Sequence, residues 1–154
     1  MSDVKVVRDW MHRGVIACTP ETSANEVAMS MAAHDVSALV VVDADGYAVG
    51  LISRTDLVNA TFVEPYLRHW RGLSARHLMS SPVISVREDT PVETAIALIR
   101  ERKIHRVVVT VAEGGRERPI GILSVSDVVG RLGRIDGLPD PILPMGDPLR
   151  GRSR

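Results

Sequence analysis

The sequence predicts an α/β fold of the α+β type, built from a strand–helix–strand–strand–helix unit that occurs twice. Three observations support this prediction: the chain repeats itself, each copy has a helical apolar period, and each copy has an apolar run of strand length. Residues 7–43 align with residues 75–111 without a gap, and residues 50–56 align with 121–127 after a shift in register. Copies of roughly 55 residues are marginal alone, so we expect them to bury apolar faces against each other.

Each unit is expected to open with a short extended segment, which is followed by a helix. The extended segments are Val15–Ile16 and Val83–Ile84. The helices are predicted by apolar residues at positions i, i+3, i+4 and i+7, which share one helical face. These residues are Ala24, Val27, Ala28 and Met31 in the first copy and Val92, Ala95, Ile96 and Ile99 in the second.

The start of each of these helices has a capping pattern. Thr90, Pro91 and Glu93 suit the N-cap, the first and the third helical positions of a capping box. In the first copy Ser23 and Glu26 have the same spacing. We therefore expect the second helix to begin at Pro91.

An apolar run without alternation follows each helix, and such a run is typical of a strand covered on both faces. The runs are Leu39–Val42 and Val107–Val109. A turn follows, at which the two copies differ in length, as hairpin tips tolerate. The unit is then completed by a second strand and a final helix. The second strands are Ala48–Ile52 and Ile120–Leu123, and the final helices begin at Ser53 and Ser124.

The repeat divides the chain into a first unit over residues 4–60 and a second over residues 75–133, joined by a linker over 61–74. Residues 134–154 contain four of the nine prolines, so we expect an irregular tail. Four methionines are expected to fill the core from helical positions. They are Met11, Met29, Met31 and Met79.

The composition narrows the class of protein. The 154 residues include 19 basic and 19 acidic side chains, and this zero net charge disfavours a nucleic-acid-binding surface. No apolar run approaches the roughly 18 residues of a membrane span, and no apolar segment of a secretory signal follows the N-terminus. Cys18 is the one cysteine and is expected to be a packed core thiol, which fits a cytoplasmic protein.

The pattern Ser-x-x-Asp occurs at the start of both final helices, at Ser53/Asp56 and at Ser124/Asp127. One interpretation is structural, because a serine N-cap with an acid at the third position is a capping-box variant. The other is functional. A helix N-terminus suits phosphate, and a carboxylate one turn into the helix can accept hydrogen bonds from a ribose diol. The sequence leaves both interpretations open.

The pair His105-Arg106 precedes the second apolar strand. It is either the solvated end of a basic run or a pair of cations that can grip a phosphate. The first copy has Ser37-Ala38 at these positions, so the repeat is chemically lopsided. The histidines do not have the spacing of metal ligands, and no nucleophile has a general base at a motif spacing. We therefore expect that the protein has no metal site, requires no cofactor and is not an enzyme.

These motifs resemble a tandem pair of CBS domains, also called a Bateman module, over about residues 4–133. The matching segments are the two openings with Met11 and Met79, the strands ending near Val-Val-Val-Asp, and Gly50–Leu57 with Gly121–Val128. The resemblance implies two β-α-β-β-α units about a pseudo-twofold axis, with their small sheets face to face. It also implies a cleft between the sheets that holds up to two adenine nucleotides.

Roles for individual residues follow from this resemblance alone. Asp56 and Asp127 would bind ribose, whereas Ser53, Ser124 and Ser126 would approach phosphate. His105 and Arg106 resemble the phosphate-contacting pair of the AMP-activated kinase gamma subunit and would serve the site of Asp56. The site of Asp127 would then have no basic pair. The backbone near Val15, Ile16, Val83 and Ile84 would contact the base.

The resemblance implies a regulatory sensor of AMP, ADP or ATP that forms a homodimer and acts on an unknown partner protein. Two alternatives remain: a dimerisation scaffold with degenerate ligand sites, and a module that binds S-adenosylmethionine or NAD. A nucleotide should stabilise a sensor against heat, but it should leave a scaffold unchanged.

Overall fold

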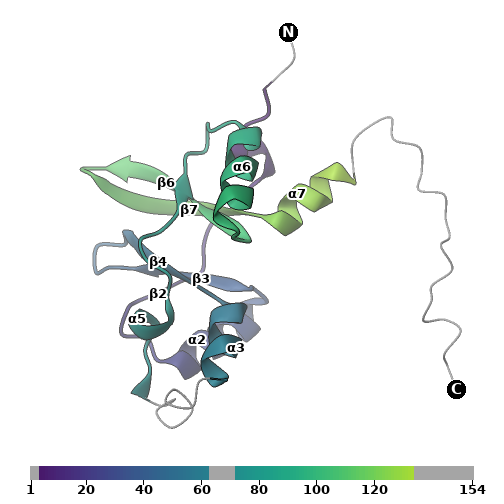
Figure 1. Ribbon diagram of the computed structural model, residues 1–154. Helices are drawn as coiled ribbons and strands as arrows, with labels where there is room; N and C mark the ends of the chain where they lie inside the picture. Colours follow the sequence, from purple (N-terminus) through teal and green to yellow (C-terminus); the bar gives the residue numbers. More distant parts are fainter. Residues whose placement is uncertain (1–3, 63–71, 134–154) are drawn as a thin grey trace, which may run out of the picture.

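The computed structural model describes residues 4–62 and 72–133. The expected tail and most of the expected linker lie outside these residues. The chain forms two stacked lobes, each made of a small sheet that faces the other lobe and helices on its outer side (Figure 1). This mixed architecture of two repeated units confirms the predicted fold class.

The lower lobe in Figure 1 contains a three-stranded sheet with the order β2-β3-β4. The central strand runs parallel to β2 and antiparallel to β4. Four of its five residues are buried, as the unbroken apolar run predicts. The strands are β2 (Ala17–Cys18), β3 (Ala38–Val42) and β4 (Ala48–Ser53).

The upper lobe contains a four-stranded sheet with the order β1-β7-β6-β5. It repeats the arrangement of the first sheet, with β5 parallel to β6 and β6 antiparallel to β7. The additional strand, β1, comes from the beginning of the chain and pairs antiparallel with β7. The strands are β1 (His12–Arg13), β5 (Ser85–Val86), β6 (Arg106–Glu113) and β7 (Arg116–Ser124).

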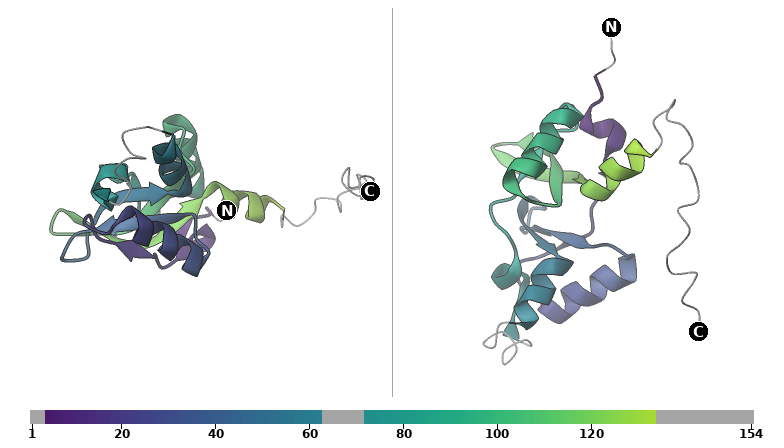
Figure 2. Two further views of the ribbon diagram at one scale, coloured as in Figure 1. Left: turned by 90° about the horizontal axis from the view of Figure 1, so that it is seen from below. Right: turned by 45° about the vertical axis from the view of Figure 1, so that its right-hand side comes forward.

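Helices cover the outer side of both sheets, as Figure 2 shows from two further directions. The two longest helices bury the predicted apolar faces, and one further helix follows the last strand of each copy. The helices are α1 (Val7–Trp10), α2 (Ala24–His34), α3 (Arg54–Thr61), α5 (Ala75–Leu78), α6 (Val92–Arg102) and α7 (Val125–Leu132).

The first helix of each copy packs against the other copy. Val7 of α1 is buried in the core of the upper lobe with Ala95 and Val107, and Ala75 of α5 is buried in the core of the lower lobe with Val27. The backbone repeats this exchange, because β1 pairs with β7 and Ser80 forms an antiparallel bridge with Leu51. Each lobe therefore needs a segment from the other copy to complete it.

The two hairpins also meet. Tyr47, in the turn between β3 and β4, lies under the guanidinium groups of Arg116 and Arg118, at 4.0 and 4.6 Å from its ring centroid. Its hydroxyl donates to Glu113 Oε2 at 3.0 Å, and Arg116 pairs with Asp43. The longer hairpin of the second copy thus reaches the turn of the first.

Some predicted boundaries are wrong. The strands β2 and β5 begin two residues after Val15 and Val83, which lie in the preceding loops. Helix α6 begins at Val92 with Pro91 as N-cap, because the Thr90 hydroxyl accepts a hydrogen bond from the Arg87 amide and thus closes a turn outside the helix. The Ser23 cap of α2 is confirmed by the Glu26 amide, which donates to the Ser23 hydroxyl at 3.2 Å.

The expectation for the methionines is correct for three of the four. Met31 is buried, and Met11 and Met79 pack against the two cores. Met29 is 69% exposed, because it lies on α2 outside the face formed by Val27 and Met31. The helical spacing that groups Val27 with Met31 already places Met29 outside the buried face.

Candidate functional site

Two pockets open between the copies, and each contains one of the two Ser-x-x-Asp motifs. The larger, which we call the Asp127 pocket, has a volume of about 470 Å³, and the smaller, the Asp56 pocket, about 290 Å³. These volumes lie at the lower end of the range for small-molecule sites. Most lining positions correspond through the repeat, so the pockets are pseudo-equivalent.

The Ser-x-x-Asp motifs form complete capping boxes. In α3, the amide and the hydroxyl of Ser53 donate to Asp56 Oδ2 at 2.8 and 3.0 Å, and the Asp56 amide donates back to the Ser53 hydroxyl at 3.2 Å. In α7 the corresponding distances between Ser124 and Asp127 are 2.9, 2.9 and 3.2 Å. The structural interpretation of the motif is therefore correct.

The same geometry leaves room for the functional interpretation. Within the described part of the chain, the hydrogen bonds accepted by the Asp56 and Asp127 carboxylates all end on Oδ2. The second oxygen, Oδ1, is left to accept from a ligand. Both carboxylates are half-buried and line their pockets. A carboxylate held in this way is preorganised for a hydroxyl donor such as a ribose diol.

The helix N-termini offer fewer amides than the sequence suggests. The first amide of each helix is already used, because Arg54 donates to the Ser37 carbonyl and Val125 to the His105 carbonyl, both at 2.9 Å. The third amide is bound within the capping box. Of the first-turn amides of α3 and α7, those of Thr55 and Ser126 remain for an anion.

Aliphatic side chains and extended backbone form the inner walls. Val83 and Ile84 line the Asp56 pocket, and Val15 and Ile16 line the Asp127 pocket, as the resemblance implies. The Ile16 carbonyl accepts from Val40 and the Ile84 carbonyl from Val108, so both segments are anchored to a central strand. No Phe, Tyr or Trp is among the described residues that line either pocket, in keeping with the low aromatic content.

The helices that precede the pockets both end in a strained residue. Asp35 after α2 and Lys103 after α6 have φ angles of 50° and 54°, in the left-handed region that favours glycine. They occupy equivalent positions, and each lines a pocket. Such strain in a pocket wall is typical of functional sites.

Arg106 lines both pockets. It is the first residue of β6, lies opposite Ser124 in the ladder with β7, and donates through Nη1 of its guanidinium to the Ser37 carbonyl at 3.3 Å. Burial lowers the pKa of Arg106 from its usual value, Asp56 opposes this by raising it, and Arg54 lowers it further. The group nevertheless remains charged, since arginine is not deprotonated in proteins.

The position of Arg106 modifies the expected asymmetry, in which the pair His105-Arg106 serves the site of Asp56 and the site of Asp127 has no basic pair. Arg106 borders both pockets, and His12, Arg13 and His34 also line the Asp127 pocket. His105 and Lys103 line the Asp56 pocket.

Ser126 is exposed at the second position of α7 and is not among the described residues that line either pocket, so its contact with a phosphate stays a prediction. Its counterpart in the first copy, Thr55, does line the Asp56 pocket. The other expected residues, Ser53, Asp56, Ser124 and Asp127, all line their pockets.

Several lining residues were missed by the sequence analysis. They come from the crossing segments and the helix ends, and include His12, Arg13, His34, Ser80 and Lys103. The repeat contains a signal for them, because His12 aligns with Ser80 and Asp35 with Lys103. The alignment assigns these residues to a pocket only if it is known that the opening segment of each copy packs against the other copy.

Cys18 is partly buried against the lower core and lines neither pocket. Burial raises the pKa of its thiol to about 11. The thiolate is the reactive form, so at pH 8 we expect the folded protein to react with a thiol reagent roughly a hundredfold more slowly than the chain unfolded in urea. The rate should increase as the pH rises towards 11. Equal rates for folded and unfolded chains would contradict this environment.

Across residues 4–62 and 72–133, no three His, Cys, Asp or Glu side chains come together as metal ligands. Within the same ranges, no helix combines the length and the apolar character that crossing a bilayer requires.

Comparison with known proteins places the chain in a family. The CBS domain model matches residues 7–62 and again residues 75–134. The chain is 31% identical to an uncharacterized protein of Methanopyrus kandleri over 80% of its own length and 60% of that protein. It is also 31% identical to the inosine-5'-monophosphate dehydrogenase of Halobacterium salinarum, over 76% of its own length and 22% of the enzyme. The chain thus spans about a fifth of that enzyme.

Solved structures agree on the fold. CBSX2 from Arabidopsis thaliana, in complex with AMP, superposes with a TM-score of 0.69 at 30% identity, covering 84% of this chain and 97% of the other. Both the sequence match and the fold extend over the two copies of the repeat. The chain belongs to the CBS domain family and contains two CBS domains in tandem.

Proposed function

We propose that the chain is a regulatory module that binds adenine nucleotide, AMP or ATP, and transmits its occupancy to a partner protein. The observation that carries this proposal is the pair of pockets. Each pocket combines a preorganised carboxylate, an aliphatic wall of extended backbone, and the guanidinium of Arg106. These three features match the ribose, the base and the phosphate of a nucleotide.

In the Asp56 pocket, the ribose diol donates to Asp56 Oδ1 and the base lies against Val83 and Ile84. The phosphate lies towards His105 and Arg106. Such charge-assisted hydrogen bonds are roughly twice as strong as neutral ones. In the Asp127 pocket, Val15, Ile16 and Asp127 take the same roles, and Arg106 again supplies a cation for the phosphate.

The structure of CBSX2 with AMP supports this proposal, since a relative of the same fold and 30% identity binds a ligand of the proposed class. The proposal assigns the chain no catalytic step. The activity of the dehydrogenase relative is not transferred, because the chain spans about a fifth of that enzyme.

A thermal-shift panel of AMP, ADP, ATP, S-adenosylmethionine and NAD tests the proposal. A ligand at a hundred times its dissociation constant stabilises the fold by about 2.7 kcal/mol, which raises the melting temperature by several degrees in a domain of this size. We expect this increase with at least one of the adenine nucleotides. If all five compounds at millimolar concentration leave the melting temperature unchanged, the chain is instead a scaffold with degenerate sites. A shift with S-adenosylmethionine or NAD alone identifies a different adenosine ligand.

We further propose that the protein is a homodimer that pairs through α3 and α7. Both helices expose apolar side chains: Val58 of α3 is 52% exposed, and its counterpart in the repeat, Val129 of α7, is 60% exposed. Apolar residues at equivalent places in both copies suit a symmetric contact between two chains.

Light scattering should therefore give about twice the chain mass of 16.8 kDa at micromolar concentration. Val129→Glu should lower the mass to that of one chain, because it buries a charge in the contact. Met29→Glu is the matched control, since Met29 is equally exposed but lies on α2. A monomeric wild type, or a loss of dimer in the control and not in Val129→Glu, would contradict the proposed contact.

A further inference from the structure

We infer that the two pockets share one guanidinium, so that a phosphate-bearing ligand in one pocket weakens the binding of such a ligand in the other. This inference rests on the proposed function, because it concerns how the two nucleotide sites regulate each other. Its structural basis is the position of Arg106 between two pseudo-equivalent pockets.

The position of Arg106 is basic in the second copy of the repeat only. Its counterpart in the first copy is Ala38, which lines the Asp127 pocket but has no side chain that could reach the other one. A symmetric pair of pockets would have one arginine each. Here a single long side chain borders both pockets.

The guanidinium can bind a phosphate in either pocket. Its one hydrogen bond among the described residues is the 3.3 Å contact with the Ser37 carbonyl, and Asp56 acts on it among these residues only as a nearby charge. Asp56 attracts it towards the smaller pocket, whereas its ladder position opposite Ser124 holds its backbone beside the larger one. A guanidinium has five N–H donors in a fixed planar fork, and a bidentate contact with one phosphate uses one edge of it.

The other cations near the pockets cannot replace it. Lys103, His105 and Arg13 are exposed, and Arg13 also pairs with Glu88 at 3.3 Å. Exposed charges are screened by solvent, so they add little to the affinity for an anion. Arg106 is half-buried, and its interaction with a phosphate is correspondingly stronger. The second ligand therefore meets a pocket without its principal cation.

A thermodynamic cycle measures this coupling. The AMP affinity of the Asp56 pocket alone is measured by calorimetry in Asp127→Asn, and that of the Asp127 pocket alone in Asp56→Asn. The product of these two association constants is then compared with the overall constant for filling both pockets of the wild type. We expect the wild-type constant to be lower than the product by a factor of about ten or more, since one charge-assisted contact is lost.

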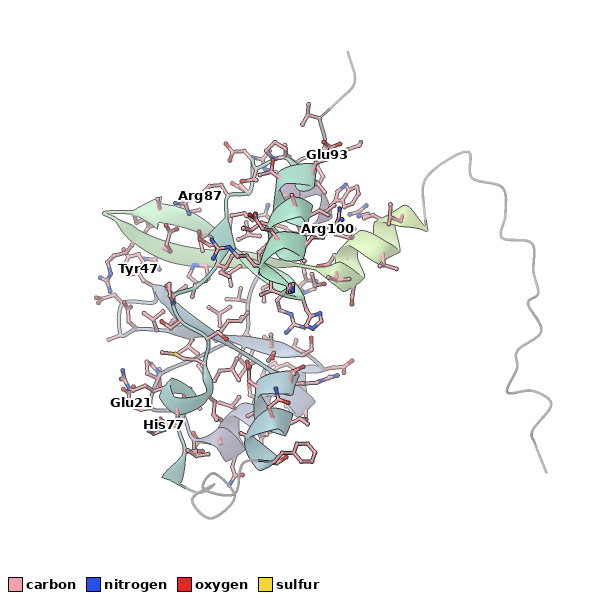
Figure 3. All side chains as sticks on the ribbon, in the orientation of Figure 1. Glu21, Tyr47, His77, Arg87, Glu93 and Arg100 are labelled. Carbon is pink, nitrogen blue, oxygen red and sulfur yellow. The ribbon has the colours of Figure 1, made fainter. Side chains whose placement is uncertain are left out.

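Two controls separate the arginine from other causes. Adenosine has no phosphate, so its cycle should close with no coupling. In Arg106→Gln, AMP should bind each pocket more weakly and its cycle should also close. Arg100→Gln, a change of the same kind on the exposed surface of α6 (Figure 3), should keep the wild-type coupling.

The outcomes are distinct. An AMP cycle that closes in the wild type, or coupling that persists in Arg106→Gln, overturns the inference while leaving the nucleotide-binding function intact. Equal coupling for adenosine and AMP also overturns it, because the phosphate would then play no part. Failure of both adenosine and AMP to bind overturns the proposed function and the inference with it.

Discussion

Replacing Asp56 by asparagine should weaken adenine-nucleotide binding in the Asp56 pocket roughly ten- to a hundredfold, since hydrogen bonds to charged groups contribute about 1.5–3 kcal/mol. The amide oxygen of asparagine can still accept from the Ser53 amide and hydroxyl, which now donate to Oδ2 at 2.8 and 3.0 Å. Its NH2 group would then take the place of Oδ1, the oxygen left for the ribose. The cap of α3 should survive, so stability should change little.

Asp127→Asn should have the same effect on the Asp127 pocket and leave the affinity that the Asp56 pocket has while the other pocket is empty nearly unchanged. Asp9→Asn is the matched control, because Asp9 also accepts from an N-cap amide at the third position of a helix but lines neither pocket. Calorimetric titration of AMP into the three variants distinguishes these cases. Losses of similar size for Asp9→Asn and Asp56→Asn would show that the carboxylates act through the fold and not through a ligand.

Gly121→Ala should lower the free energy of unfolding by about 1–3 kcal/mol, the usual cost of overpacking a well-packed site. A Cβ at Gly121 would lie 2.6 Å from the His12 carbonyl oxygen, which is a backbone atom of β1. The strand β1 would have to move away from β7. This movement would weaken the 2.8 Å hydrogen bond that the Gly14 amide donates to the Ile120 carbonyl. Since His12 and Gly14 line the Asp127 pocket, ligand binding there should weaken as well.

Chemical denaturation of Gly130→Ala gives the control. Among the described residues outside its own helical turn, no atom lies within 4 Å of where a Cβ of residue 130 in α7 would be, so Gly130→Ala should stabilise the helix by about 0.5–1 kcal/mol. Gly50→Ala is the pseudo-equivalent of Gly121→Ala, but there the new Cβ meets the side chain of Met79, which can bend away in part. We therefore expect a smaller loss. A neutral or stabilising Gly121→Ala would contradict the close crossing of β1 over β7.

The local structure was largely predictable from the sequence, because it depends on short-range chemistry. The Ser53 and Ser124 caps form at the predicted residues, since a serine hydroxyl and a carboxylate three residues later satisfy each other's backbone groups. The apolar runs of β3 and β6 are buried, because an apolar run without alternation is typical of a strand that is covered on both faces. The repeat itself identified the pseudo-equivalence of the pockets.

The exchange of the opening segments between the copies was not predictable in the same way. A four-residue helix such as α1 has no preference of its own for one lobe. Val7 is buried with Val107 of the other copy, and the alignment of one copy with the other does not indicate which of the two cores receives it. The histidine and arginine of β1 reach the Asp127 pocket as a result.

The role of Arg106 depends on the length of its side chain and on its place in the assembled fold. In the repeat Arg106 aligns with Ala38, and this predicted one site with a basic pair and one site without it. In the structure the residue lies beside both pockets, so the asymmetry concerns one shared charge. Distances across a pseudo-twofold axis cannot be obtained from spacing along a chain.

The central claim is that both pockets bind adenine nucleotide through their carboxylates. It is tested most directly by an equilibrium titration of AMP into the wild type and into the double variant Asp56→Asn/Asp127→Asn, with the melting temperature of each measured alongside. We expect saturable binding to the wild type that is lost, at the same AMP concentrations, in a double variant that remains folded. Equal binding to both proteins, or no binding to the wild type at millimolar AMP, would contradict the claim.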